Sequence, residues 1–478
     1  MRRIRSGLLA AIVATCVAGP SPRVLAANAA ALRAGAAVVD VTPQTLPVSM
    51  TGSFSDRQAT AVHDPLKVRC LVIDDGRTRV ALLTVDSCLV SRATFDEAKR
   101  RASQAAHIPV DHILMSATHT HTAVSVVDLA DCRADARYLE FLTKKLAEAV
   151  VLAARRLQPA RLGWGVASLP GEVFNRRWKL RPGTSTTDPF GRTADRVKTN
   201  PGIENPDVDE AAGPTDPDVM VLAATTTDGK PLALYAVYSL HYVGGIPRDS
   251  LSADYFGEFA AQVGRRLAPE SSEFVALLAN GTSGDINNID TRTQRPPAAP
   301  FERVRVVAAN AAAAAVEAYR ACEFADDVRL QAVAEDLSLG VRKPSADDLA
   351  QAQAYLADAV GKPVDVVRSV YAREQQELAR WPDTFAVPLQ VLRIGGLAIA
   401  AIPCEAFVQI GLDVKRRSPR RPTFVVGLAN GYHGYLPTPE QHALGGYETW
   451  RCRWSYLEVD ASTKITDALV RMLDDTEP

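Results

Sequence analysis

The sequence predicts an α/β fold in which mixed sheets with β-hairpins are flanked by helices. Short apolar runs of strand length alternate with longer segments of helical periodicity along the 478 residues. Three pairs of apolar runs are joined by short turns at Asp75-Gly76, Asp228-Gly229 and Gly395-Gly396, which is typical of hairpins. The composition, 47% hydrophobic and 23% charged, is that of a globular protein with a large core.

The individual elements follow from the same patterns. Helical segments are marked by apolar residues at spacings of three and four, as at Leu139, Leu142 and Leu146. In chain order we expect a strand at 32–41, a hairpin at 66–86, a helix at 93–106, a strand from 113, a helix at 137–157, a strand at 161–168, a hairpin at 219–238, a helix at 255–267, a strand at 274–278, helices at 302–320 and 345–380, a hairpin at 387–400, a strand at 423–428 and a helix at 466–473. Residues 181–217 are rich in Pro, Gly, Thr and Asp and predict a long polar loop, either a functional lid or a disordered excursion.

The first 26 residues have the pattern of an export signal. A basic start with three arginines precedes an apolar stretch at 8–18, and Val24-Leu-Ala26 provides a small-residue cleavage site. We therefore expect an exported protein, periplasmic or secreted, whose mature part is one domain at 27–478. The apolar stretch is too short to span a bilayer, and no later segment is apolar for long enough.

Charge and cysteine content exclude two classes of function. Without the four arginines of residues 1–26 the chain has 50 basic and 55 acidic residues, a net charge of about −5, which does not favour a nucleic-acid partner. Six cysteines remain, none in a C-x-x-C pair, so a cysteine zinc cluster is not expected. One or two disulfides would suit an oxidising compartment, but the sequence assigns no pairing.

Polar clusters follow several of the apolar strands. Ile113-Leu-Met-Ser-Ala-Thr-His-Thr-His-Thr122 places His119 and His121 after a buried strand, and if they continue that strand they share one face. The other polar groups that follow strands are His241, Asn280–Asp285, Glu405 and Tyr435. Strand ends commonly converge on the site of an α/β enzyme. Two histidines, a carboxylate and an open position suit Zn²⁺, whereas two satisfied loop histidines are the plain alternative.

Five motifs, taken in order, resemble those of the neutral/alkaline ceramidase family. They are Ala117-Thr-His-Thr-His-Thr122, Gly284-Asp285, Pro403-x-Glu405, Gly427-Leu-Ala-Asn-x-Tyr-x-x-Tyr435 with Thr438-Pro-Glu440, and Tyr447-Glu448. The resemblance covers nearly the whole mature chain and implies the catalytic N-terminal domain of a zinc-dependent amide hydrolase of N-acylsphingosines.

The resemblance also implies roles for individual residues. It implies zinc ligands at His119, His241, Glu405 and Tyr435, and catalytic roles for His121, Arg176 and Tyr447. His121 matches the histidine that contacts the zinc-bound water. Arg177, beside Arg176, leaves the arginine assignment open by one position. Each residue also has a plain alternative: Glu405 as a helix cap, the tyrosines as core aromatics and Arg176 as a surface charge.

The sequence departs from the family pattern at three places. Asn287 stands where the family has a serine implicated in catalysis, and an amide cannot act as that nucleophile. Ala123–Asp128 replaces a glycine-rich segment, and the family's immunoglobulin-like C-terminal domain is not expected in this chain.

From these patterns we expect an exported zinc hydrolase that cleaves the C–N amide bond of an N-acyl substrate, such as a lipid amide, by metal-activated water. It would act on a small-molecule or lipid partner, with peripheral membrane contact at most. Alternatives are a metal-dependent hydrolase of esters or of non-lipid amides, and an inactive exported binding protein on the same fold. A barrel amidohydrolase and a metallo-β-lactamase rank low, because hairpins interrupt strand–helix alternation and Thr122-Ala-Val124 does not continue as x-D-H.

Overall fold

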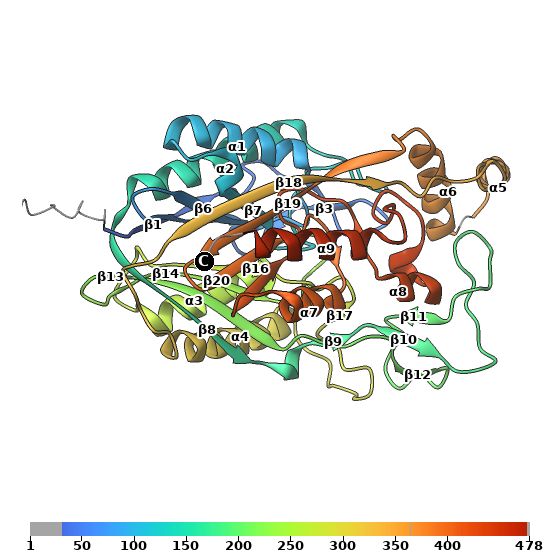
Figure 1. Ribbon diagram of the computed structural model, residues 1–478. Helices are drawn as coiled ribbons and strands as arrows, with labels where there is room; N and C mark the ends of the chain where they lie inside the picture. The colour runs from blue at the N-terminus through green and yellow to red at the C-terminus, as the bar shows by residue number, and fades with distance from the viewer. Residues whose placement is uncertain (1–30, 364, 476–478) are drawn as a thin grey trace, which may run out of the picture. The chain divides into compact units, whose positions relative to one another are not determined.

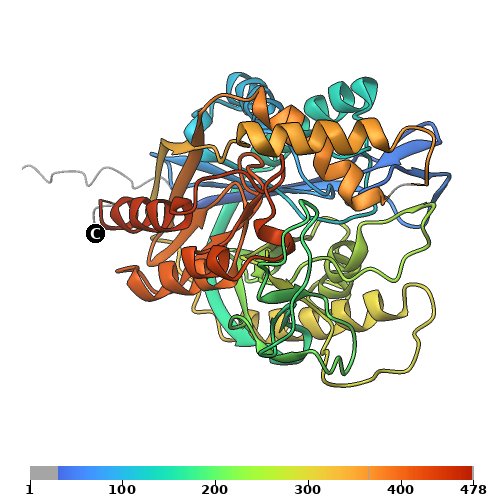
Figure 2. The same cartoon turned by 90° about the vertical axis from the view of Figure 1, so that its right-hand side faces the viewer.

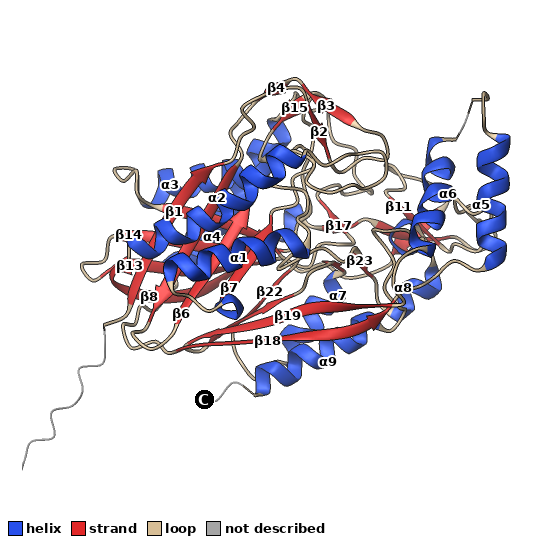
Figure 3. Ribbon diagram, turned by 90° about the horizontal axis from the view of Figure 1, so that it is seen from above, coloured by secondary structure: helices blue, strands red, loops and turns tan. Residues whose placement is uncertain are grey.

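The computed structural model describes residues 31–363 and 365–475. The predicted signal segment at 1–26 lies outside these residues. Two sheets packed face to face form the centre of the fold, and helices cover their outer faces (Figures 1 and 3). The mixed α/β class, with sheets, hairpins and flanking helices, is confirmed.

The larger sheet has eight strands. Their order across the sheet is β16 (Val275–Asn280), β14 (Pro231–Tyr238), β13 (Asp218–Thr226), β8 (Gln158–Ser168), β1 (Arg33–Asp40), β5 (Lys67–Asp74), β6 (Arg79–Val85) and β7 (Ile113–Ala117). The predicted hairpins β5–β6 and β13–β14 are antiparallel neighbours, whereas β6–β7 and β14–β16 are parallel pairs. The outer face carries helices α1 (Arg92–Ala106), α2 (Ala136–Arg155), α3 (Asp254–Leu267) and α4 (Glu302–Arg320).

The smaller sheet has four strands and closes the inner face of the larger one. Its order is β18 (Leu330–Gly340), β19 (Thr384–Ile394), β20 (Leu397–Ala401) and β22 (Thr423–Val426). Side chains such as Leu82 and Tyr235 of the large sheet meet Ile399 and Phe424 of the small one in a buried apolar layer. Helices α7 (Val408–Arg417) and α9 (Ala461–Asp474) cover the opposite face of the small sheet.

The two edges of the large sheet approach each other, although β7 and β16 are its outermost strands. β16 contacts β5, β6 and β7, and Asn280 Nδ2 donates to the carbonyl of Thr118 at 3.3 Å. The segment 427–430, which follows β22, joins both edges: Gly427 N donates to Asn280 O (3.0 Å), and Ala117 N donates to Leu428 O (3.1 Å). The ends of β7, β14, β16, β20 and β22 therefore meet in one place.

The predicted helix at 345–380 is two helices. α5 (Ala346–Asp358) and α6 (Val366–Ala379) form an antiparallel pair at one end of the molecule, which faces the viewer in Figure 2. Gly361, with φ of 72°, and Pro363 lie between them and end the helical pattern. The alanine-rich composition concealed this break.

Residues 181–217 contain short strands as well as loops. β11 (Val197–Thr199) and β12 (Val208–Ala211) pair with β10 (Arg177–Leu180) in a small sheet. Phe190 of this segment packs edge-on against Tyr371 of α6, and Arg192 forms an ion pair with Asp348 of α5. The polar segment is thereby attached to the α5–α6 pair.

The remaining short elements lie mainly around the ends of the large-sheet strands. They are β2 (Val48–Met50), β3 (Arg57–Ala59), β4 (Ala61–Val62), β9 (Phe174–Asn175), β15 (Ser250–Leu251), β17 (Ile286–Asn287), β21 (Glu405–Ala406), β23 (Tyr435–Leu436) and α8 (Pro439–Leu444), with 3₁₀ turns at Val110–His112, Pro170–Glu172 and Tyr447–Thr449. None of the helices in the described ranges is long and apolar enough to cross a membrane.

A buried lysine supports the segment 427–430 and gives a pH-dependent prediction. Lys99 of α1 is only 5% exposed, and its Nζ donates to Asn430 Oδ1 at 2.7 Å. Burial lowers the pKa of Lys99 from 10.5 to about 8. Between about pH 8 and 10.5 the unfolded chain therefore binds more protons at Lys99 than the folded protein does, so the free energy of unfolding rises with pH in this window. The destabilisation by buried, charged Lys99 is fully present at pH 7 and is lost as the pH rises through the window.

We expect Lys99→Met to remove the burial penalty and so raise the free energy of unfolding at pH 7 by up to about 3 kcal/mol. The lost hydrogen bond to Asn430 offsets about 1 kcal/mol of this gain. Asn430 Oδ1 keeps a second donor, the backbone N of Met115 at 3.2 Å. Urea unfolding of both proteins at pH 7 and pH 10 measures the effect. The difference between variant and wild type should shrink at pH 10, and a difference independent of pH would contradict this account.

Candidate metal centre

Three histidines meet with their rings fixed in the same way. The Nδ1 atom of each lies at a backbone carbonyl: His119 at Cys88 O (2.6 Å), His121 at Gly52 O (3.1 Å) and His241 at Ser283 O (3.0 Å). A carbonyl oxygen only accepts, so each Nδ1 carries a proton, and the neutral form of each ring has its lone pair at Nε2. This is how metal-binding histidines are usually oriented.

The three Nε2 atoms gather around that of His119, and two of them lie within 4 Å of Glu405. His119 Nε2 lies 3.0 Å from His241 Nε2 and 3.2 Å from His121 Nε2. Glu405 Oε2 lies 3.1 Å from His119 Nε2 and 3.8 Å from His241 Nε2, and it has no hydrogen-bond partner although it is buried. Lone pairs cannot satisfy one another, so the group calls for a positive charge among these atoms, either a proton between His119 and Glu405 or a metal ion. His119, His241 and Glu405 form a buried group whose ligand atoms all lie within 4.8 Å of one another.

The electrostatics of the site favour one positive charge. Burial lowers the pKa of His119, but Glu405 and Cys88 together outweigh it, and the net pKa is well above the ordinary value. The pKa values of His121 and His241 are held well below it, by burial and by the charge on His119. Burial raises the pKa of Glu405, but His119, Arg176 and Tyr432 together outweigh it and hold the pKa below its usual range, so this group is a carboxylate. A divalent cation would supply the charge, with two imidazoles and a carboxylate as ligands typical of zinc.

The sequence left open whether His119 and His121 continue the strand before them, and in the structure they do not. β7 ends at Ala117, and His119 has a φ of +74°, so His119 and His121 do not share a strand face. Their rings instead meet edge to face, with centroids 4.7 Å apart. A positive φ is rare for histidine and is held here by the hydrogen bond from His119 N to Ser87 O (2.9 Å).

The Gly-Asp turn supports the ligand loop from behind. A Cβ on Gly284 would lie 2.3 Å from the carbonyl oxygen of Glu405, so only glycine fits. Asp285 accepts from the backbone N of Val408 (2.8 Å) and from Asn175 Nδ2 (2.8 Å). Asp285 therefore holds the start of α7 and the β9 strand and is not in the ligand group.

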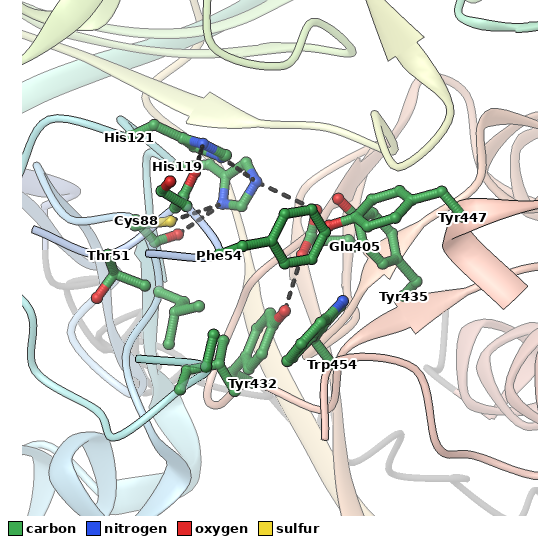
Figure 4. Close-up of a pocket in the computed structure, with 15 residues that line it drawn as sticks. Thr51, Phe54, Cys88, His119, His121, Glu405, Tyr432, Tyr435, Tyr447 and Trp454 are labelled. Atoms are coloured by element: carbon green, nitrogen blue, oxygen red, sulfur yellow. Dashed lines mark hydrogen bonds and ion pairs between the residues drawn. The ribbon is translucent and has the colours of Figure 1, made fainter. Parts of the chain in front are cut away.

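An aromatic wall completes the site. A cavity of about 250 Å³ opens beside the histidines (Figure 4). Its lining includes the predicted residues His119, His121, Glu405, Tyr435 and Tyr447, together with Phe54, Cys88, Leu89, Leu129, Tyr432 and Trp454. Tyr435 is paired with Glu405 in the β21–β23 ladder, and its hydroxyl accepts from Arg176 at 3.0 Å.

The structure distinguishes the two neighbouring arginines. Arg176 points at the site, because its guanidinium reaches Tyr435 and lies 3.4 Å from His241 Nε2. Arg177 points away and contacts Gln441 and the carbonyl of Gly445. Arg176 lies behind Tyr435 and His241 and is not among the residues that line the described cavity.

One buried carboxylate holds both arginines. Glu448 is fully buried and accepts from Arg176 Nε (2.9 Å) and from Arg177 Nη1 (2.5 Å). Burial raises the pKa of Glu448, but the two arginines outweigh it and hold the pKa below its usual range. Thr199 of the 181–217 segment donates to the same carboxylate at 2.7 Å.

Asn287, which the sequence resemblance aligns with the family serine, lies outside the described cavity lining. It sits in β17, paired with Phe174 of β9, and its Nδ2 donates to Asn200 Oδ1 at 2.6 Å. Its side chain thus ties the turn to the 181–217 segment.

Sequence reasoning assigned no role to Tyr432, Glu448 or Cys88. The hydroxyl of Tyr432 donates to Glu405 Oε1 at 2.8 Å, which orients the carboxylate. Tyr432 and Glu448 stand inside the motifs that resemble the ceramidase family, so their position in the sequence could have pointed to them. For Cys88 the sequence offered only its place just after β6. All six cysteines in the described part of the chain are free thiols, so the disulfides considered from the sequence are not formed among them.

Comparison with known proteins agrees with this architecture. The neutral ceramidase of Pseudomonas aeruginosa is 21% identical over 480 aligned positions, which cover 87% of this chain and 68% of that protein. A solved structure described as a ceramidase complexed with C2 superposes with a TM-score of 0.69 at 18% identity, covering 93% of this chain and 75% of the other. The neutral ceramidase structure from P. aeruginosa gives 0.67 at 19% identity, with the same coverages.

No protein-family model matches the sequence. The assignment of the fold therefore rests on the layered sheets and on the two similar solved structures. The similarity to these structures extends over most of the described residues. Taken with the five motifs, these findings show that the described residues form a domain with a neutral ceramidase-like fold.

Proposed function

We propose that the protein is an exported, zinc-dependent hydrolase that cleaves the C–N amide bond of an N-acyl substrate of the ceramide-like, lipid amide class. The observation that carries the proposal is the buried group in which the Nε2 atoms of His119 and His241 meet the carboxylate of Glu405, with His121 Nε2 beside His119. The similarity to neutral ceramidase supports the amide as the bond cleaved. Export rests on the signal pattern of residues 1–26.

His119, His241 and Glu405 would hold the zinc, with Tyr435 as a further oxygen donor. When bound, zinc lowers the pKa of a water to about 7 and polarises a carbonyl. The residues present fit this ion because their donors are two imidazoles and one carboxylate, with buried Glu405 Oε2 lacking a hydrogen-bond partner.

His121 is placed to move the proton. Its Nδ1 is held by Gly52 O, and its Nε2 faces the ligand group from the cavity wall. Burial lowers the pKa of His121, so the ring is neutral and able to accept a proton from the attacking water and then donate it to the leaving amine.

Tyr447 and Arg176 would stabilise the developing oxyanion in different ways. Burial raises the pKa of Tyr447, so its hydroxyl remains a donor, and it lines the cavity. Arg176 acts through the hydroxyl of Tyr435, to which it donates. A donor of this kind is typically worth about 3 kcal/mol in the transition state. No covalent intermediate is required, which is compatible with Asn287 in place of the serine.

The cavity lining favours an apolar substrate. Phe54, Leu89, Leu129 and Trp454 line the space beside the histidines, which is the environment an acyl chain requires. A hydrolase of esters or of non-lipid amides is the second candidate, favoured by a cavity of only about 250 Å³, which is small for a whole long-chain lipid. A lipid substrate would also imply peripheral contact with a membrane surface.

The test is metal analysis of the purified protein with a panel of substrates. We expect about one zinc per chain, and zinc-dependent release of the amine from ceramide or a shorter N-acyl amide, with the matching ester included for comparison. Asn287→Ser should leave the zinc content unchanged, because the residue lies outside the cavity lining. Cleavage of the ester alone would favour the second candidate. Protein that binds no metal and turns over no substrate would contradict both and leave the binding-protein alternative.

A further inference from the structure

Cys88 places a thiol in the wall of the site. It follows the end of β6, is 2% exposed and lines the cavity beside the histidines (Figure 4). Its carbonyl oxygen accepts from His119 Nδ1 at 2.6 Å, and its Sγ lies 3.8 Å from the same nitrogen. One residue thus fixes the tautomer of His119 and brings a sulfur beside the ring.

The thiol belongs to a second set of donors. Cys88, His119 and His121 have ligand atoms within 4.8 Å of one another, as do His119, His241 and Glu405. Both groups contain His119, whose Nε2 lies between those of His241 (3.0 Å) and His121 (3.2 Å). Because His119 has one free lone pair, a single ion uses either group at a time.

The two donor sets differ in chemical softness. The first combines imidazoles with a carboxylate, and the second combines imidazoles with a thiolate. Soft thiolate ligands select soft, thiophilic metals, whereas carboxylates suit harder ions. The side chain of His121, which the proposed mechanism needs as a free base, would be a ligand in the second set.

The other described cysteines lack this setting. Cys132 and Cys452 donate to backbone carbonyls, at Met50 and Trp450 respectively. Cys70 and Cys404 are fully buried members of the apolar core. Cys322 donates to Ala318 O on the helical layer. Among the residues that the structure describes, only Cys88 falls in a candidate metal-binding group.

We propose that Cys88, His119 and His121 form an alternative metal site that takes a thiophilic divalent cation such as Cd²⁺. On binding, the Cys88 thiol loses its proton to solvent and a sulfur–metal bond forms, with no change of oxidation state. The ion occupies His119 and His121 together, so it excludes zinc from the first donor set and removes the base. Thiophilic metals would therefore inhibit the hydrolase. The inhibition rests on the proposed function, whereas the site itself does not.

The experiment is a titration of metal-free protein with Cd²⁺, followed by sulfur-to-metal charge-transfer absorption in the ultraviolet. Wild type should give one thiolate band at about one equivalent. Cys88→Ser should lose the band, and its Cd²⁺ affinity should fall by roughly tenfold or more. Cys132→Ser, which removes another buried thiol from near the cavity, should keep the band. If Cys88→Ser does not fold by circular dichroism, Cys88→Ala replaces it.

A second pair of variants separates the two donor sets. Glu405→Gln should lose zinc and keep the cadmium–thiolate band, whereas Cys88→Ser should keep zinc and lose the band. The band is read without substrate, so failure of amide hydrolysis does not affect the result. A band that persists in both Cys88 variants, or that disappears in Cys132→Ser, would overturn the proposal.

Discussion

Replacing Glu405 by alanine is expected to release the bound metal and to lower hydrolysis by roughly a thousandfold or more. Glu405 supplies the only carboxylate in the His119–His241–Glu405 group. Its loss removes the negative charge that balances the cation, and a metal typically contributes several kcal/mol to the transition state, with each 1.36 kcal/mol worth about tenfold in rate. Metal content by elemental analysis and the rate of amine release measure the two effects.

Tyr432→Phe is the matched control for this experiment. It keeps the carboxylate and removes only the hydroxyl that donates to Glu405 Oε1. Loss of an orienting partner of this kind typically costs about 10–100-fold in metal affinity. The alanine variant should therefore lose metal outright, whereas the phenylalanine variant should recover zinc at higher concentration. Glu405→Ala protein with full zinc content would show that the ligand assignment is wrong.

Replacing Glu448 by alanine is expected to destabilise the protein by about 3–5 kcal/mol, because it leaves two buried guanidinium groups without their counter-charge. Arg177 is 0% exposed and Arg176 only 6% exposed, so solvent cannot replace the carboxylate. Denaturant unfolding followed by circular dichroism measures the loss.

Two further variants interpret that result. Glu448→Gln keeps the shape and some hydrogen bonds but not the charge, so its destabilisation isolates the electrostatic contribution. Glu440→Ala removes an exposed carboxylate eight residues earlier and should change the free energy of unfolding by no more than about 0.5 kcal/mol. A Glu448→Ala protein as stable as wild type would mean that the arginines find other partners.

The local part of the fold was predictable because local patterns determine it. The turns at Asp75-Gly76, Asp228-Gly229 and Gly395-Gly396 each join the expected antiparallel strands. The helix expected at 93–106 runs from Arg92 to Ala106. Alternation and turn chemistry act over a few residues, so a single sequence shows them directly.

Features that depend on distant contacts were not predictable in the same way. The strand containing Ile113 ends before His119, because Ser87 and Cys88 from another strand end hold that histidine in a left-handed conformation. Choosing between Arg176 and Arg177 required the positions of Tyr435 and Gln441, which lie 259 and 264 residues further along the chain. Most residues of the candidate metal centre were recognisable from the motifs, while their mutual geometry, and the thiol of Cys88 among them, depended on how the sheet edges meet.

The joining of both sheet edges by residues 427–430 has a consequence for the order of events in biogenesis. Synthesis proceeds from the N-terminus, so His119 and His241 are made long before the segment that brings their strands together. Contacts of such long sequence separation form late in folding. In a nascent chain the histidines are therefore still apart, and the candidate ligand group assembles only once residues 427–430 have docked.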